Sequence, residues 1–275
     1  MPTVDDALEA QYALRKRHPE REAIYADHQR RSAALRAAGP CCLDVRYGDG
    51  PRCLLDVFPA GERAPIVFFV HGGYWRALDK SYVSFIAAPF RDAGMTVVMP
   101  SYDLAPAVRI GEIVDQVRQA LAWTMAHLAP ERVVVAGHSA GGQLAAMLAL
   151  DQAASGHGRI VGLAGISGAF DLRPLLRTSI NRDLKLSAAE AAEASPLLRL
   201  ARLPASACLV PLLGLVGGDE TRGFKQWTAD LVAGWRAHGG AASYGELDGC
   251  NHFNILDRVA EADGEVLRGI TAILS

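Results

Sequence analysis

The feature that most constrains the fold is an alternation of apolar strands and helices over most of the chain. From about residue 65 to the end, short runs rich in valine and isoleucine alternate with longer runs of helical character. The run at 66–70 is apolar throughout, as expected for a strand that is buried on both faces of a sheet. This alternation predicts an α/β chain with a mostly parallel central sheet and helices on both faces.

The predicted elements are separated by glycine and proline. The expected strands are 42–47, 53–58, 66–70, 96–99, 132–136, 160–166, 209–216 and 241–247. The expected helices are 79–93, 109–128, 139–151, 222–238 and 254–273, preceded by one or two helices over 5–37. Residues 170–205 interrupt the alternation with prolines and scattered charges. We therefore expect one domain over 1–275, with an N-terminal helical segment over 1–40 and a cap-like insertion over 170–205 that covers a site.

Composition excludes several classes of function. The chain has 275 residues, is 50% hydrophobic and has a formal net charge of −2, which suits one large domain with a sizeable core. It contains no basic run that could track nucleic-acid phosphates and no apolar stretch of roughly 18 residues for a membrane span. The acidic start of the chain lacks a secretory pattern, and the cysteine count of 5 is odd. These features predict reduced thiols and a cytoplasmic location.

A glycine-flanked serine stands between a predicted strand and a predicted helix. The run GHSAG at 137–141 follows the apolar strand and precedes a strong helix former. A serine at such a turn holds its hydroxyl toward substrate, and the helix N-terminus favours developing negative charge. A side chain at either flanking position would collide with the neighbouring strand or helix, which explains the glycines. We expect Ser139 to be a catalytic nucleophile.

The run HGGYW at 71–75 directly follows another predicted strand. Acyl transfer passes through a tetrahedral oxyanion, which needs N–H donors about 3 Å away. A glycine pair lets the backbone approach that oxygen closely, although a tight turn alone would also explain it. The expected oxyanion-hole donors are the backbone N–H groups of Gly72, Gly73, Tyr74 and Ala140.

Two later residues could complete a catalytic triad. Asp219 ends the predicted strand 209–216 and could orient a histidine, although it could also simply cap the following helix. His252 follows the strand 241–247 and is the expected general base. The order serine, aspartate, histidine is that of an α/β-hydrolase. Asp248 is a rival acid, but Asp219 is favoured because it comes from a separate strand end.

Neither a metal nor a cofactor is expected. No set of histidine, cysteine and carboxylate residues has the spacing of a zinc site, and no glycine-rich phosphate loop is present.

Several motifs together resemble one family. They are LEAQY at 8–12, HGGYW at 71–75, SYDLAP at 101–106, GHSAG at 137–141, ISG at 166–168, DL at 171–172, SPL at 195–197, GDE at 218–220 and NHF at 251–253. Over nearly the whole chain, the sequence resembles the kynurenine formamidase (arylformamidase) branch of the α/β-hydrolases. The resemblance implies hydrolysis of N-formyl-L-kynurenine to kynurenine and formate, a step of tryptophan catabolism, and a homodimer.

Such a substrate sets requirements for the site. Its aromatic amine needs a flat apolar slot, which Tyr74, Trp75 and Tyr102 could line, although Tyr102 could equally pack in the core. Its carboxylate needs a cation or several hydrogen-bond donors. The candidates, among which the sequence does not choose, are Arg76, Arg173, Arg177, Ser179, Asn181 and Arg182.

Two other functions remain open at this point. The first is a carboxylesterase of the same branch that acts on small aryl or short-chain esters. The second is a binding protein with a hydrolase fold that has lost catalysis, because a fold does not fix a function.

Overall fold

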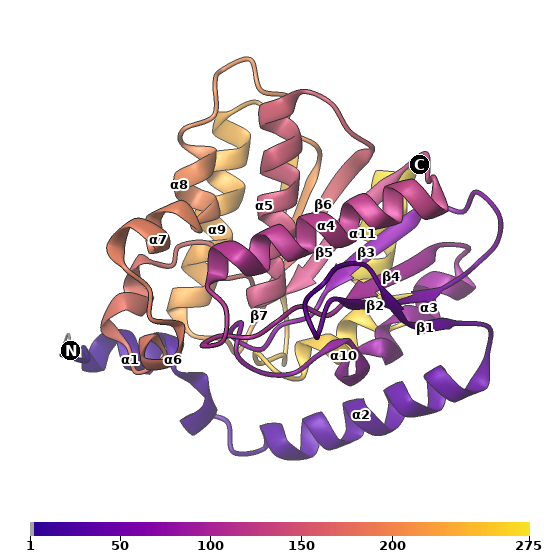
Figure 1. Cartoon of the computed structure of the whole chain (residues 1–275). Coiled ribbons are helices and arrows are strands. Elements are labelled where there is room, and N and C mark those ends of the chain that lie inside the picture. The colour runs from indigo at the N-terminus through magenta and orange to yellow at the C-terminus, as the bar shows by residue number, and fades with distance from the viewer. Residues whose placement is uncertain (1–2) are drawn as a thin grey trace.

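The computed structural model describes residues 3–275 and has one eight-stranded sheet with helices packed on both sides (Figure 1). The strands are β1 Cys42–Arg46, β2 Leu54–Phe58, β3 Ile66–Val70, β4 Thr96–Pro100, β5 Val133–His138, β6 Ile160–Ile166, β7 Leu212–Gly217 and β8 Ala242–Leu247. Their order in the sheet is β1-β2-β4-β3-β5-β6-β7-β8. Only the pairs made by β2 are antiparallel, so the predicted mostly parallel sheet is confirmed.

The sheet separates two hydrophobic clusters. The main helices are α2 Arg21–Ala38, α3 Ala87–Asp92, α4 Ile110–Leu128, α5 Ala140–Ser155, α9 Arg222–Ala237, α10 Ile255–Val259 and α11 Glu265–Leu274. Helices α4, α5 and α9 contribute to the cluster on one face, and α3, α10 and α11 to the cluster on the other. Successive residues of β3 point to opposite faces, with Phe68 in the first cluster and Phe69 in the second. Both faces of this strand are therefore buried, which explains its unbroken apolar run.

Two predicted helices are interrupted in the structure. The stretch 79–93 divides into η2 Lys80–Tyr82, η3 Ser84–Ile86 and α3. The N–H of Phe85 donates to Ser32 Oγ in α2, 3.1 Å away, instead of to a carbonyl one helical turn earlier. The stretch 254–273 divides into α10 and α11, because Gly264 adopts an extended backbone (φ −70°, ψ 159°) and caps the second helix.

The N-terminal segment lies along the outside of the sheet domain and is fastened at several points (Figure 1). It consists of α1 Asp6–Tyr12, η1 Leu14–Lys16 and α2; the first two residues of the predicted 1–40 segment lie outside the described range. The Tyr12 ring stacks on Trp227 of α9 at 4.3 Å. His28 Nε2 lies 3.0 Å from the Asp257 carboxylate of α10. These contacts fix the stretch between α1 and α2 against the body of the protein.

Residues 170–205 form short helices, namely η4 Arg173–Arg177, α6 Asn181–Leu184, α7 Ala188–Glu193 and α8 Pro196–Leu200. Gln143 of the buried helix α5 donates through Nε2 to the Ala194 carbonyl, 2.9 Å away. The insertion is thus held beside α5, and Figure 1 shows α7 and α8 close to α9.

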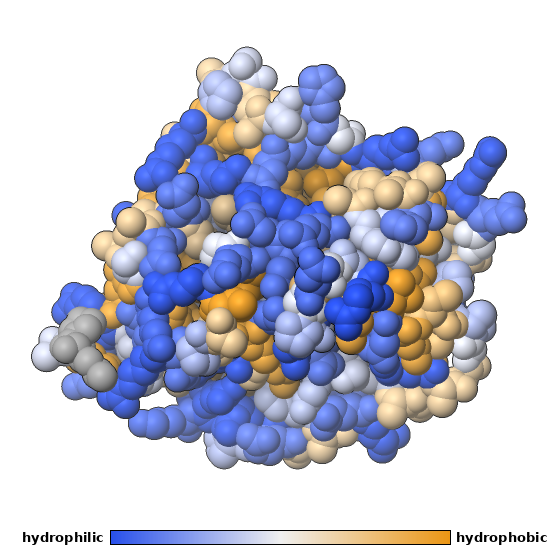
Figure 2. All heavy atoms as spheres, in the orientation of Figure 1, coloured by the Kyte–Doolittle hydropathy of each residue, from blue (hydrophilic) through white to orange (hydrophobic). Residues whose placement is uncertain are grey.

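The surface visible in Figure 2 is mostly hydrophilic, with hydrophobic residues in smaller patches between. Within residues 3–275, no helix combines the length and apolar character that a membrane span requires.

Candidate active site

Ser139 occupies a sharp turn between β5 and α5. Its backbone has φ 57° and ψ −119°, a conformation that residues other than glycine rarely adopt. A Cβ atom at Gly137 would lie 2.2 Å from the Gly141 carbonyl oxygen, and one at Gly141 would lie 2.0 Å from the Val70 carbonyl oxygen. The two flanking glycines are therefore required by close backbone contacts. The expectation that side chains there would collide with a neighbouring strand or helix is confirmed.

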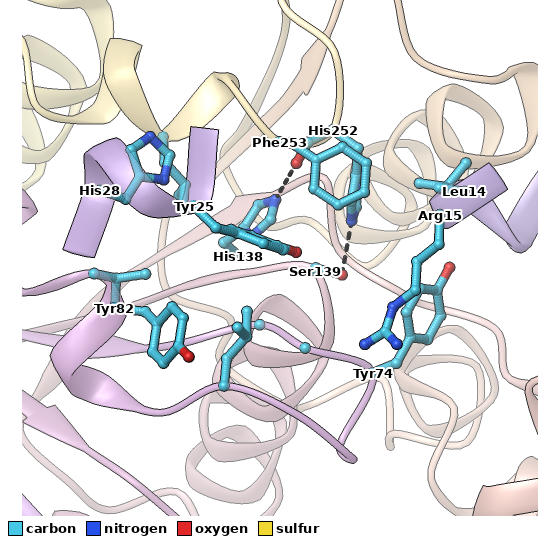
Figure 3. Close-up of a pocket in the computed structure, with 15 residues that line it drawn as sticks. Leu14, Arg15, Tyr25, His28, Tyr74, Tyr82, His138, Ser139, His252 and Phe253 are labelled. Carbon is cyan, nitrogen blue, oxygen red and sulfur yellow. Dashed lines mark hydrogen bonds between the residues drawn. The ribbon is translucent and has the colours of Figure 1, made fainter. Parts of the chain in front are cut away.

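The hydroxyl of Ser139 contacts the imidazole of His252. Its Oγ lies 2.9 Å from Nε2 of the histidine, and both residues are buried (Figure 3). His252 lies in the loop between β8 and α10, so two segments far apart in the sequence meet here. Nδ1, the other ring nitrogen of His252, faces the carboxylate of Glu220 and carries the ring hydrogen. Nε2 therefore accepts the hydrogen bond from the Ser139 hydroxyl.

The carboxylate behind His252 belongs to Glu220. Its Oε2 lies 2.7 Å from Nδ1 of the histidine, and the carboxylate is fully buried. Its Oε1 accepts hydrogen bonds from the Ser167 hydroxyl and from the Gly217 N–H, the latter at 3.2 Å. Asp219 is exposed, so the prediction that it would contact the imidazole is wrong.

The turn after β7 explains this difference between adjacent acids. The N–H of Asp219 donates to the Cys250 carbonyl at 2.9 Å, and the N–H of Glu220 donates to the Gly217 carbonyl at 3.1 Å. This turn directs the longer side chain beneath the histidine and leaves its neighbour in solvent. The rival acid Asp248 is also exposed. The sequence indicated an acid at this strand end, because Asp219 and Glu220 are adjacent there. It did not show which of the two side chains turns toward the histidine.

The loop after β3 lies directly against the serine. A Cβ atom at Gly72 would lie 3.1 Å from Ser139 Cβ, and Gly73 has a φ of +119° that favours glycine. Gly72, Gly73 and Tyr74 line the same cavity as Ser139. Throughout residues 3–275, the N–H groups of these three residues and of Ala140 find no hydrogen-bond acceptor. None of these four hydrogens is therefore used by another described part of the chain, and three of the four residues line the cavity.

A small cavity of about 40 Å³ lies in front of Ser139, with room for a few water molecules. Its walls are loop 72–83, the start of α10 and four residues of the N-terminal segment: Leu14, Arg15, Tyr25 and His28 (Figure 3). Among the described residues that line it, none comes from 170–205. The expectation that this insertion covers the site is wrong, because it packs beside α5 while the N-terminal segment forms the wall.

Of the residues predicted to bind substrate, Tyr74 lines this cavity, whereas Trp75, Tyr102 and Asn181 do not. Trp75 is fully buried, and its indole N–H donates to Gln143 Oε1 at 3.0 Å. Tyr102 is also fully buried; its hydroxyl donates to the His71 carbonyl at 2.9 Å, so the alternative of core packing is correct. The Asn181 side chain is taken up by its own helix end, where it accepts from the Leu186 N–H at 2.7 Å. All three predictions are wrong because backbone or core partners occupy these side chains.

A second histidine lies against the loop that carries His252. Nε2 of His138 lies 3.0 Å from the His252 carbonyl, which can only accept, so this nitrogen donates (Figure 3). Burial, followed by the nearby His252, holds the pKa of His138 well below 6.5, and its ring is neutral. His138 therefore fixes the backbone of this loop. In residues 3–275, no three histidine, cysteine or acidic side chains gather into a metal-binding group.

Comparisons with known proteins agree with this geometry. The α/β hydrolase fold family matches residues 67–256. A kynurenine formamidase from Salmo salar is 30% identical over 230 residues, which cover 80% of this chain and 78% of that protein. The chain belongs to the kynurenine formamidase branch of the α/β hydrolases. A kynurenine formamidase from Danio rerio is 28% identical over 93% of this chain and 92% of its own length.

A solved structure from the same superfamily extends the likeness to the three-dimensional fold. A protein from Silicibacter described as a candidate thioesterase is 33% identical, covers 92% of both chains and superposes with a TM-score of 0.77. A protein described as a thioesterase thus shares the fold of this chain, and the chain is a hydrolase by its relatives.

Proposed function

We propose that this protein is a serine hydrolase that cleaves aryl formamides, with N-formyl-L-kynurenine as the substrate and L-kynurenine and formate as products. The observation that carries the proposal is the 2.9 Å contact between Ser139 Oγ and His252 Nε2, with Glu220 2.7 Å behind the imidazole. Its relatives named kynurenine formamidase support the choice of substrate. In this scheme the reaction is a step of tryptophan catabolism.

In the first half of the reaction, Ser139 Oγ attacks the formyl carbon and His252 Nε2 takes the hydroxyl proton. A C–O bond forms and the carbonyl electrons move onto oxygen. The N–H groups of Gly72, Gly73, Tyr74 and Ala140 are the proposed donors to this oxyanion. The Glu220 carboxylate stabilises the imidazolium that forms.

The C–N bond then breaks, and the imidazolium gives its proton to the leaving arylamine. A formyl ester remains on Ser139. A water molecule attacks this ester while His252 accepts a proton from the water. The second tetrahedral intermediate then collapses to formate. The serine oxygen regains the proton from the imidazolium, which restores the starting state.

The tight space around the serine favours the smallest acyl group. The missing side chain of Gly72 leaves only a narrow gap beside Ser139, and the whole cavity is about 40 Å³. Typical ligand pockets are roughly 300–1,000 Å³, so the aryl part of a substrate requires side chains of the wall, such as those of Arg15 and Tyr25, to move aside while the backbone keeps its place. A formyl group needs little room on the acyl side, whereas a longer acyl chain needs more.

Hydrolysis of short esters is the second candidate. The same nucleophile, base and donors would cleave an ester, and the structural relative described as a thioesterase supports that reading. The two candidates differ in the acyl and leaving groups rather than in the catalytic residues.

Steady-state kinetics separate them. We expect the wild type to have a higher kcat/KM for N-formyl-L-kynurenine than for p-nitrophenyl acetate or butyrate. An ester kcat/KM that is higher by orders of magnitude would refute the formamidase proposal. Ser139→Ala should abolish both activities and labelling by a fluorophosphonate, whereas Ser243→Ala, at an exposed serine of β8, should change neither.

The cytoplasmic location and the homodimer remain predictions. Light scattering after size-exclusion chromatography tests the dimer directly, because it gives the mass of the species in solution.

A further inference from the structure

One permanently charged side chain lines the cavity in front of Ser139. This side chain is that of Arg15 in η1. Among the described residues of the cavity wall, none is an aspartate or a glutamate. Within residues 3–275, the Arg15 guanidinium forms neither an ion pair nor a hydrogen bond. Arg15 is exposed, so solvent reaches its guanidinium, and no carboxylate of the cavity wall neutralises the charge. An anionic ligand in the cavity would therefore meet an available cation.

The arginines that the sequence offered for this role are mostly engaged elsewhere. Arg76 pairs with Asp183, Arg173 pairs with Asp171 and Arg177 pairs with Asp5. Arg182 is exposed beside a different hollow, at α6. None of these four lines the cavity that holds the serine.

The backbone beneath Arg15 is held in place. The Arg15 carbonyl accepts a hydrogen bond from the Arg21 guanidinium, and the preceding Leu14 is buried in the main hydrophobic cluster. Figure 3 shows the Arg15 side chain extending from η1 toward the space between Tyr74 and Ser139. The segment therefore presents the guanidinium at a fixed side of the site.

A second donor faces the same space. Tyr25 of α2 lines the cavity, its ring packs edge-on against Phe253 at 5.7 Å, and its hydroxyl points inward (Figure 3). In the described part of the chain, this hydroxyl has no hydrogen-bond partner. Burial raises the pKa of Tyr25 to about 12, against a smaller opposing effect of the Arg15 charge, so the hydroxyl keeps its proton at neutral pH. A guanidinium and a phenol are together suited to the two oxygens of a carboxylate.

We propose that Arg15, assisted by the Tyr25 hydroxyl, binds the carboxylate of the substrate and makes the enzyme selective for formamides with an acidic over those with a neutral leaving group. This inference rests on the proposed function for the identity of the substrate, an aryl formamide with an amino-acid side chain. The formyl group then lies at Ser139 while the carboxylate lies at the N-terminal wall. Arg15 is a specificity-determining residue in this arrangement and takes no part in bond breaking.

The test compares an acidic with a neutral formamide. For Arg15→Gln, we expect kcat/KM for N-formyl-L-kynurenine to fall about 10- to 100-fold, mainly through KM, as a charge-assisted contact is lost. The kcat/KM for 2-formamidoacetophenone, which lacks the amino-acid part, should stay within about twofold. Arg15→Lys should retain part of the kcat/KM that Arg15→Gln loses. Tyr25→Phe should lower kcat/KM less than Arg15→Gln does, and again only for the acidic formamide.

Arg17→Gln is the matched control, because Arg17 is exposed in the same stretch but does not line the cavity. Arg17→Gln should leave kcat/KM for both formamides unchanged. Equal losses on the acidic and neutral formamides for Arg15→Gln, or no loss on either, would overturn the inference. Thermal melting of each variant shows whether the fold is intact.

The two proposals fail in different ways. If the wild type does not hydrolyse N-formyl-L-kynurenine, the proposed function fails. The role of Arg15 is then tested with the acetate ester of 4-hydroxyphenylacetic acid against 4-methylphenyl acetate, because the carboxylate of the acidic ester is on the leaving group, as it is in the formamide. A wild-type preference for the acidic ester that disappears in Arg15→Gln would still support carboxylate binding. An identical ester preference in wild type and variant would refute it.

Discussion

The carboxylate of Glu220 lies 2.7 Å from Nδ1 of His252 and is fully buried, whereas the adjacent Asp219 is exposed. The hydroxyl of Ser167 and the N–H of Gly217 hold the other carboxylate oxygen. The histidine is therefore oriented by a carboxylate that is itself fixed by two donors.

This relationship predicts opposite outcomes for two neighbouring substitutions. Glu220→Gln should lower kcat by about 10³-fold or more, because an amide can donate to Nδ1 and favours the wrong tautomer of the histidine. Asp219→Asn should leave kcat within about twofold, since that side chain faces solvent. Single-turnover kinetics of the two variants measures the rate of the chemical step. A larger loss of rate in Asp219→Asn than in Glu220→Gln would contradict the placement of Glu220 behind His252.

The serine turn should tolerate no side chain at Gly141. In Gly141→Ala, the new Cβ would lie 2.0 Å from the Val70 carbonyl oxygen, so we expect a loss of about 3 kcal/mol or more in the free energy of unfolding. The matched control is Gly111→Ala near the start of α4, where a Cβ meets nothing within 4 Å. This control should stabilise the protein by about 0.5–1 kcal/mol. Urea denaturation measures both, and equal effects would show that the turn is not constrained as described.

Two buried histidines should make the fold sensitive to acid. Burial lowers the pKa of His71 from 6.5 to about 4, and that of His138 well below 6.5. Below pH 6.5 the unfolded chain binds protons at these rings while the folded protein does not, so stability falls as the pH falls. Between pH 7 and pH 5, His71 alone should cost about 2 kcal/mol of unfolding free energy.

Urea denaturation at the two pH values tests this dependence. His71→Asn keeps a donor for the Gly72 carbonyl and removes the titrating ring, so its unfolding free energy should change less between pH 7 and pH 5. His157→Asn, at an exposed histidine, should retain the wild-type dependence. An unaltered pH dependence in His71→Asn would show that this ring is not the source.

A single hydroxyl connects the N-terminal wall to the active-site loop. The Tyr74 hydroxyl donates to the Tyr12 carbonyl at 2.5 Å, in a buried setting. Tyr74→Phe should lower the unfolding free energy by about 1–2 kcal/mol, because the carbonyl loses its partner, and should raise KM as the wall loosens. Tyr244→Phe removes an exposed hydroxyl that bonds Glu246 and should change neither quantity. Melting curves and substrate titrations give both readouts, and an unchanged KM in Tyr74→Phe would show that this hydrogen bond does not position the wall.

Local sequence was sufficient to predict the sheet, the serine turn and the place of His252 beside it. Apolar runs such as 66–70 and 160–166 became strands with the predicted bounds, since continuous burial leaves a continuous hydrophobic pattern. The glycines around Ser139 are a local requirement of backbone contact, so they are visible in the sequence. His252 could be placed because it follows a strand end that faces the same edge of the sheet.

Only the tertiary structure decided which acid orients the base and which segment encloses the site. Asp219 and Glu220 are adjacent, and their roles depend on how one turn packs against the loop that carries Cys250. Arg15 lies far in the sequence from Ser139, Glu220 and His252, and it reaches the cavity because α1 and α2 are fastened to α9 and α10. Periodicity records whether a residue is buried, but contacts between distant segments depend on side-chain packing across the whole fold, which no local pattern records.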